Sequence, residues 1–254
     1  NAIVAEAKQT ASLYDFTAVD GVRHVVWRID QADQMRALGE AFARIPNTYI
    51  ADGHHRAASA VRVGLKRREE HPGYRGDEPY NYFLSVLFPD EELMIMDYNR
   101  VVRDLNGLSE ETFLERIRAD FEVRTMGSEP VRPAGKGEFG MFLSDCWYLL
   151  KAKRPPCGDP VADLDVSVLQ DTLLGPVLGI GDPRTDTRID FIGGIRGLSE
   201  LVRRCHVDMK VAFSMYPTSI EELFQVADAG RLMPPKSTWF EPKLRSGLFI
   251  HQLS

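Results

Sequence analysis

The sequence predicts a mixed α/β chain of the α+β type, 254 residues long. Short runs rich in β-branched and aromatic residues alternate with alanine-rich, charged stretches of helical composition. Hydrophobic residues make up 44% of the chain, which suffices for a packed core and excludes a disordered protein. The longest apolar runs, such as residues 82–88, are far shorter than the ~20 residues of a membrane span. We therefore expect a soluble protein with no membrane partner.

The N-terminal part predicts the order hairpin, helix, strand, helix. Asp20-Gly21 separates two β-rich runs and favours a hairpin turn. Apolar residues then recur at three- and four-residue steps, as on one side of an amphipathic helix, and Pro46 follows them. The expected elements are strands 13–19 and 22–29, helix 31–44, a buried strand 47–51 and helix 54–68.

The middle of the chain predicts further strands and two helices. Strands 80–88 and 92–97 flank Pro89-Asp90, and Ser109 is a good N-cap for a helix that ends near Asp120. The remaining expected elements are strand 121–125, strands 138–143 and 146–152 with a turn at 144–145, and helix 164–174.

The last third begins with strand 188–192, helix 198–204 and strand 210–215. Thr218 and Glu221 have the spacing of a capping box before a helix that Gly230 ends.

Charge and cysteine content narrow the class of protein. A net charge of −6 argues against a large nucleic-acid interface, which needs a basic surface. The three cysteines have no CxxC spacing, so we expect reduced thiols and a cytoplasmic location. Because the chain begins with Asn1 and not with methionine, we expect a fragment or a processed product.

The strongest local motif comes where the expected strand 47–51 meets the expected helix. It consists of Asp52, Gly53, His54, His55 and Arg56. Helix N-terminal N–H groups, a glycine and a guanidinium together favour a phosphate. Asp52 would repel a phosphate, so it would better orient a histidine, hold magnesium or accept a hydroxyl proton. The alternative is that Asp52 only caps the helix and the histidines are solvated.

A second motif, residues 233–238, places Lys236, Ser237 and Thr238 after two prolines. A lysine with two hydroxyl groups can bind phosphoryl oxygens or complete a magnesium site. The motif is not a Walker A loop, because its glycines are missing and the helix precedes the lysine. An ordinary proline-rich turn is the alternative. Further basic residues follow at Lys243, Arg245 and His251, and scattered charges of this kind are usually solvated.

A third stretch, residues 179–194, mixes acidic and basic residues with glycines. We expect a salt-bridged loop more than a metal site, formed by Asp182, Arg184, Asp186, Arg188 and Asp190. No dinucleotide-binding fingerprint is present.

Two pairs of neighbouring residues offer weaker leads. Gly193-Gly194 would admit a ligand close to the backbone, and a turn explains it equally well. A nucleophilic thiol at Cys205-His206 is a weaker interpretation than a half-buried cysteine, and a zinc site lacks the required spacing.

Three stretches together resemble the proteins of the domain of unknown function 1015. They are YIADGHHRAASA, DPRTDTRIDFIGG and GRLMPPKSTWFEPKLRSGLFIHQL, and they extend over most of the chain. That family is similar to the ParB/sulfiredoxin-like fold, a mixed sheet with helices. Its nearest relative of known activity is an ADP-dependent free serine kinase. The resemblance implies phosphoryl transfer between a nucleotide, ADP or ATP, and free serine or phosphoserine, with magnesium as a possible partner.

The resemblance also implies roles for individual residues. Asp52 would be the catalytic or metal-orienting carboxylate, and His54 and His55 would complete the catalytic group. His55 and Arg56 would contact phosphates, together with Gly53. Because phosphoryl transfer depends on positioning and charge neutralisation, we expect Lys236, Ser237 and Thr238 to close on the phosphates from the other side. The motif has no cysteine, so repair of a sulfinic acid is not expected. Family members carry a further N-terminal segment, which we expect to be missing before Asn1.

We expect three parts in the chain. Residues 1–90 would form the ParB/sulfiredoxin-like part, 91–210 an inserted α+β subdomain, and 211–254 a segment that returns to the site. Two other functions stay open. A ParB-like, nucleotide-dependent DNA-binding protein should carry a basic helix-turn-helix, which the sequence lacks. A non-catalytic sensor of a nucleotide or an amino acid would bind without turnover.

Overall fold

A computed structural model describes residues 2–253, with the side chain of His55 left outside the description. The chain divides into two compact units, Asn1–Ile50 and Ala51–Ser254, and each is described by itself. Within residues 2–253, none of the helices combines the length and the apolar character that a bilayer crossing requires.

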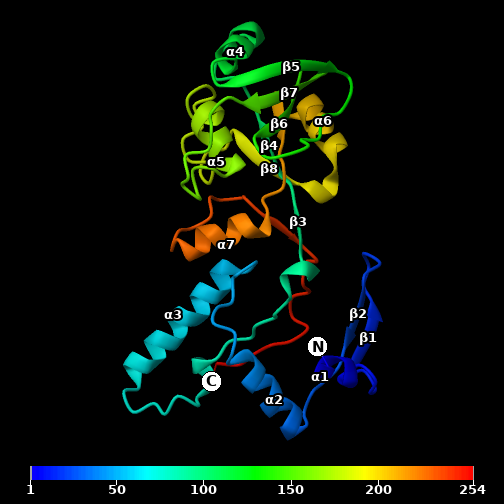
Figure 1. Cartoon of the computed structure of the whole chain (residues 1–254), viewed down its shortest axis with the longest axis vertical. Helices are drawn as coiled ribbons and strands as arrows, with labels where there is room; N and C mark the ends of the chain where they lie inside the picture. Colours follow the sequence, from blue (N-terminus) through cyan, green and yellow to red (C-terminus); the bar gives the residue numbers. More distant parts are fainter. Residues whose placement is uncertain (1, 254) are drawn as a thin grey trace. The chain divides into compact units, whose positions relative to one another are not determined.

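The first unit contains two helices and one hairpin (Figure 1). Strands β1 (Tyr14–Thr17) and β2 (Arg23–Val26) pair antiparallel, and Gly21 takes a φ of 81° in the turn. The predicted hairpin and the predicted helix are therefore confirmed. The predicted buried strand 47–51 is wrong, because Ile50 is 49% exposed and the segment finds no partner strand. The helices of this unit are α1 (Ala2–Ala7) and α2 (Ala32–Phe42).

The second unit is built around a six-stranded antiparallel sheet in the order β5-β7-β6-β9-β4-β8 (Figure 1). Its strands are β4 (Tyr98–Val102), β5 (Phe121–Gly127), β6 (Glu138–Leu143), β7 (Cys146–Ala152), β8 (Ile189–Gly193) and β9 (Val211–Ser214). A separate two-stranded sheet joins β3 (Met94–Met96) to β10 (Trp239–Glu241). The α+β class predicted from the sequence is confirmed.

The second unit also contains five α-helices among its described residues. They are α3 (His54–Glu70), α4 (Glu110–Ile117), α5 (Asp165–Leu169), α6 (Leu198–Val207) and α7 (Ile220–Asp228). Four of them, α4 to α7, contribute residues to the apolar clusters on the sheet. A π-helical stretch, η3 (Gln170–Leu174), continues α5. The remaining short helical turns are η1 (Pro79–Asn81), η2 (Asp90–Glu92) and η4 (Gly194–Arg196).

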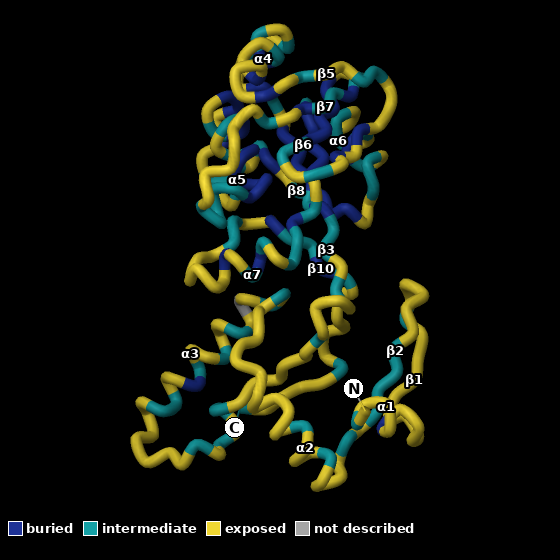
Figure 2. The backbone as a smooth tube through the Cα atoms, viewed as in Figure 1, coloured by how far each residue is buried: buried dark blue, intermediate teal, exposed yellow. Residues whose placement is uncertain are grey.

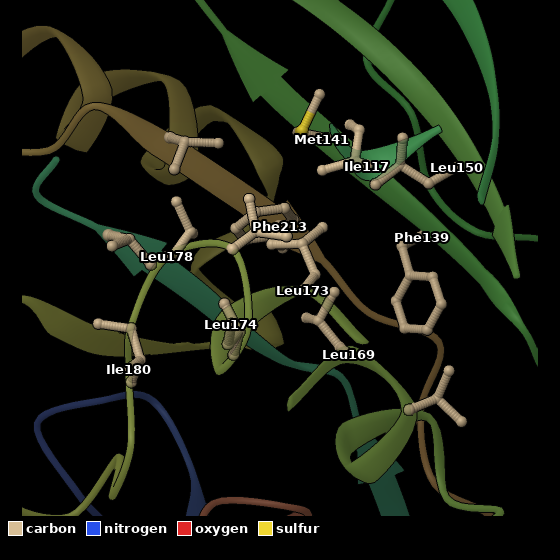
Figure 3. Packing of buried hydrophobic residues seen from close by; sticks show 14 of the residues in the cluster. Ile117, Phe139, Met141, Leu150, Leu169, Leu173, Leu174, Leu178, Ile180 and Phe213 are labelled. Atoms are coloured by element: carbon tan, nitrogen blue, oxygen red, sulfur yellow. The ribbon is translucent and has the colours of Figure 1, made fainter. Parts of the chain in front are cut away.

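The core of this unit lies on both faces of the six-stranded sheet. Because side chains alternate along a strand, Val102 belongs to one apolar cluster and Val101 to the other. The larger cluster includes residues of α4, α5 and α7, and Figure 3 shows part of it around Phe213. The smaller cluster includes Leu201 of α6 and Trp147. Figure 2 shows the buried residues concentrated in the sheet, whereas α3 is mostly exposed.

Local sequence signals placed several of these elements correctly. Ser109 caps α4 by accepting a hydrogen bond from the Thr112 N–H, as predicted. The turn between β6 and β7 falls at Ser144 and Asp145, which take positive φ values of 48° and 61°. Such values match the right-handed twist of a tight hairpin.

Two predictions in this unit are wrong. Residues 82–88 form no strand and are largely exposed, because β3 pairs with the distant β10 and not with this neighbouring run. The capping box lies one residue later than predicted, at Ser219 and Glu222. Thr218 is instead buried, and its hydroxyl donates to the carbonyl oxygen of Ser237.

Candidate functional site

The N-terminus of α3 is shaped by a glycine. Gly53 is the N-cap residue with a φ of 80°, in the left-handed region that glycine adopts readily. Arg56 folds back over it, since a Cβ built on Gly53 would stand 3.2 Å from the Arg56 Nε. The Gly53 N–H donates to Asp52 Oδ1 at 2.7 Å, and none of the described side chains caps the first turn. The N–H groups of that turn therefore remain available to an anion, and Asp52 is not the helix cap.

Asp52 forms an ion pair with a residue from the far end of the chain. Lys243 Nζ lies 3.0 Å from Asp52 Oδ2, and it also lies 5.1 Å from the centre of the Trp239 ring. Partial burial alone would raise the pKa of Asp52. Hydrogen bonds from Lys243 and Gly53, with the charges of Lys243 and Arg56, outweigh burial and lower this pKa. Asp52 is thus a stable carboxylate and a weak base.

The C-terminal segment is held in place by packing against the sheets. Phe240 of β10 pairs with Ile95 of β3, and the Trp239 ring meets the edge of Tyr98 at a centroid distance of 5.3 Å. Gly193 makes room for this indole, because an added Cβ would stand 2.6 Å from Cε3 of Trp239. These contacts fix the aromatic surface over which Lys243 lies.

Its neighbour Gly194 admits a protein side chain as well. A Cβ on Gly194 would stand 2.2 Å from Oδ1 of the buried Asp97. The Gly193-Gly194 pair is therefore occupied by protein packing.

The second motif forms a tight loop before β10. Lys236 takes a φ of 58°, and its Nζ lies 5.7 Å from the centre of the Tyr98 ring. Ser237 is 5% exposed, and its hydroxyl donates to the Pro234 carbonyl oxygen at 2.5 Å. In this arrangement the Ser237 proton is engaged within the loop. Lys236 is exposed and Thr238 is half-buried.

The structure brings part of the candidate site together. Asp52, Gly53 and Arg56 meet at the start of α3, and Lys243 joins them. His54 is exposed at the first residue of α3, while the His55 side chain lies outside the described residues. The 236–238 loop is linked to this group through Trp239 and Lys243. In the part of the chain that the structure describes, no hydrogen bond or ion pair joins the loop to residues 52–56 directly.

The charged residues of the third predicted stretch have structural partners, and burial makes the Cys205 thiol inert. Two ion pairs confirm the predicted salt-bridged loop: Arg184 with Asp182, and Arg188 with Asp186. Asp190 pairs outside the loop, with Arg204 of α6. Burial raises the pKa of Cys205 to about 12, which makes its thiol a poor nucleophile at neutral pH. No group of three or more His, Cys, Asp or Glu side chains in the described residues could hold a metal ion.

Sequence reasoning missed two residues that shape this region. Trp239 was not assigned a role, although an indole next to a lysine-rich segment is a signal for a cation–π contact. Arg100 lies in β4, a strand that was not predicted, and is only 3% exposed. Its guanidinium donates to the carbonyl oxygens of Tyr98 and Lys236. The available signal was an arginine directly before the apolar pair Val101-Val102.

Comparison with known proteins gives one family and several remote structural neighbours. A family model described as "Protein of unknown function (DUF1015)" matches residues 1–167. A search of curated proteins finds no match.

Three structural neighbours illustrate the remote matches. A conserved hypothetical protein from Pyrococcus furiosus has a TM-score of 0.41 and 16% identity, over 78% of this chain and 72% of that one. Free serine kinase in complex with AMP has a TM-score of 0.38 and 14% identity, over 84% and 81%. A variant of free serine kinase in complex with ADP has a TM-score of 0.37 and 16% identity, also over 84% and 81%.

Proposed function

We propose, from the premise that this chain belongs to the family described as "Protein of unknown function (DUF1015)", that it is a nucleotide-binding phosphotransferase. The reaction is phosphoryl transfer between ADP or ATP and free serine or phosphoserine. The observation that carries the proposal is the ion pair between Asp52 and Lys243. It joins the start of α3 to the C-terminal segment that follows the 236–238 loop, which supports a shared site for the two predicted motifs.

The start of α3 supplies the phosphate-binding groups. The N–H groups of the first turn, which no described side chain caps, and the helix dipole favour an anion there. Gly53 has no side chain to block the approach, and Arg56 lies beside it with a guanidinium that can grip two oxygens. Phosphoryl transfer depends mainly on positioning and charge neutralisation, which these groups provide. Lys236, Thr238 and the two histidines remain predicted contacts of the phosphates or the acceptor.

Asp52 is suited to orient the acceptor hydroxyl group. Because Lys243 and Gly53 lower its pKa, Asp52 stays ionised and accepts hydrogen bonds at neutral pH. When serine displaces Lys243 from Oδ2, that oxygen can accept the serine hydroxyl proton as a hydrogen bond and direct the oxygen towards the phosphorus. Both Asp52 oxygens already have partners. Residues near Asp52 therefore do not fit a magnesium site made by protein alone, and no step is assigned to magnesium.

The test is an exchange assay with isotope-labelled phosphate among serine, phosphoserine, ADP and ATP. We expect transfer by the unmodified chain and a loss of at least about a hundredfold in Asp52→Ala, the size typical of a removed acid–base or orienting group. Asp145→Asn changes a carboxylate whose side chain is 81% exposed, and serves as the matched control.

Two outcomes contradict the proposal. Nucleotide binding without any exchange indicates a sensor, and tight, salt-sensitive binding of duplex DNA indicates a ParB-like protein. The ParB/sulfiredoxin-like assignment, the division at residues 90 and 210, and a cytoplasmic location remain predictions that accompany this function.

A further inference from the structure

A second candidate site lies within the same unit, between β4, β8, the α5–η3 helix and the 234–235 prolines. A cavity of about 740 Å³ opens there, a volume typical of small-molecule sites. Its lining is mostly apolar, with Val166, Leu174, Ile189 and Phe191 among the contributors. It contains none of the residues from Asp52 to Arg56.

Arg100 gives this cavity a buried positive charge. It lies on the same sheet face as Val102, and its guanidinium carbon lies 5.7 Å from the centre of the Phe191 ring. Its hydrogen bonds go to carbonyl oxygens, and no described carboxylate forms an ion pair with it. Burial lowers the pKa of Arg100 to about 10, so the group is still a cation at neutral pH. Buried charges are normally paired, because leaving one unpaired is costly.

Among the other charged residues that line the cavity, all but one carboxylate form ion pairs. Arg184 pairs with Asp182, and Arg231 pairs with Asp159. Asp171 also lines the cavity, and it makes no ion pair or hydrogen bond with any described side chain. The cavity therefore presents one buried cation and one exposed carboxylate without partners of opposite charge.

Helical geometry explains why Asp171 faces the cavity. Ser167, Gln170, Asp171 and Leu174 are spaced by three and four residues along the α5–η3 helix, and all four line the cavity. Gln170 is fixed by donating from Nε2 to the Ile180 carbonyl oxygen. One helix face thus offers polar groups on a stable frame.

We propose that this cavity binds a small zwitterion with an apolar body, an amino acid or a short peptide, whose carboxylate pairs with Arg100 and whose ammonium pairs with Asp171. The guanidinium supplies the stronger interaction, because Arg100 is only 3% exposed and a buried charge is screened less than an exposed one. Asp171 is exposed, so its attraction is screened and weaker. The apolar lining favours a large aliphatic or aromatic side chain over a serine hydroxymethyl group. This site is independent of the proposed phosphotransferase site.

The test is isothermal titration calorimetry of the whole chain with L-phenylalanine, L-leucyl-L-leucine and L-serine. The amino acid and the dipeptide both carry one carboxylate and one ammonium group, at different separations. The one that binds more tightly shows whether the cavity takes an amino acid or a short peptide. Each is compared with its C-terminal amide and its N-acetyl form. We expect saturable binding of L-phenylalanine or of the dipeptide, weakened about tenfold in the amide and less in the N-acetyl form.

Variants assign the two charges. Arg100→Met should weaken binding of the parent ligand about tenfold and leave the affinity of the amide unchanged. Asp171→Asn should weaken binding of the parent ligand by a smaller factor and leave the affinity of the N-acetyl form unchanged. Arg56→Met is the matched control at the α3 site and should bind normally. If Arg100→Met does not fold, the affinities of the unmodified chain for the parent ligand, its amide and its N-acetyl form still test the proposal.

Several results would overturn the proposal. They are no saturable binding at about 10 mM of any probe, equal affinity for the acid and its amide, or loss of binding in Arg56→Met. Preferred binding of L-serine would contradict the apolar specificity. Because phosphate exchange is measured separately, its failure leaves this inference standing, and the reverse also holds.

Discussion

The indole of Trp239 lies so close to the backbone of Gly193 that a methyl group there would stand 2.6 Å from Cε3. This contact connects β8 of the six-stranded sheet to the C-terminal segment, and Lys243 lies over the same indole. Gly193 therefore helps to position Lys243 beside Asp52, because it makes room for the indole over which Lys243 lies.

Gly193→Ala should destabilise the fold. An inserted methyl group forces the indole or the strand to shift, and overpacking of this kind costs about 1–3 kcal/mol. Chemical unfolding followed by tryptophan fluorescence measures the change. Gly135→Ala is the control, because a Cβ there meets nothing within 4 Å. Adding Trp239→Leu should recover part of the loss, and equal destabilisation by both glycine variants would contradict the packing described.

Lys243→Met should raise the pKa of Asp52. The lysine lowers that pKa through a hydrogen bond and through its charge, while partial burial works in the opposite direction. Removing the lysine leaves burial opposed mainly by Gly53 and Arg56, so the carboxylate should take up its proton at a higher pH. Carboxyl carbon NMR of labelled aspartate follows the titration. Lys66→Met, at a lysine whose side chain is 74% exposed, should leave the Asp52 titration where it was.

Local signals predicted much of the sheet unit but little of how its distant parts meet. The Ser109 cap and the 144–145 turn depend on a few neighbouring residues, so the sequence alone located them. The pairing of β3 with β10 depends on residues far apart in the chain, and the nearby apolar run 82–88 was wrongly preferred.

The same reasoning applies to the candidate site. The residues from Asp52 to Arg56 were recognisable as a motif, because their types and order favour an anion. The ion pair between Asp52 and Lys243 was not recognisable, because nothing near Asp52 in the sequence indicates it. Arg100 was missed because its meaning depends on burial, which only the packed sheet creates.

Stability should fall between about pH 4 and pH 7 because of Asp165. Burial raises the pKa of this carboxyl to about 6 from its ordinary value of 3.8, against a hydrogen bond from the Gly137 N–H. The folded state thus binds the proton more tightly than the unfolded state does. The resulting stabilisation, roughly 3 kcal/mol at most, is complete below the ordinary pKa and is lost as pH rises through 6.

Asp165→Asn removes this titration and keeps an oxygen that can accept from Gly137. The variant should show a flatter dependence of unfolding free energy on pH and should exceed the unmodified chain in stability at pH 8. Urea denaturation at a series of pH values makes the comparison. Asp120→Asn, at an exposed carboxylate, should retain the original pH dependence. An unchanged slope in Asp165→Asn would show that another group is responsible.

Thr218→Val should loosen the loop that carries Lys236. The buried threonine hydroxyl donates to the Ser237 carbonyl oxygen at 3.0 Å. Valine has nearly the same shape but no donor, and an unsatisfied buried carbonyl costs about 1–3 kcal/mol. Thermal unfolding gives the global effect, and amide hydrogen exchange around Lys236 gives the local one. Thr125→Val, on an exposed strand position, should change neither.

The ion pair that defines the candidate site joins residues 191 positions apart in sequence, and the Arg100 hydrogen bond to the Lys236 carbonyl spans 136. Contacts of such high contact order close long loops, and their entropic cost delays them until the strands around them have formed. We therefore expect the sheet to fold first and the C-terminal segment to dock onto it afterwards. We expect reversal of that last step to open the site while the core stays folded, which would make the site a separate, less stable cooperative unit.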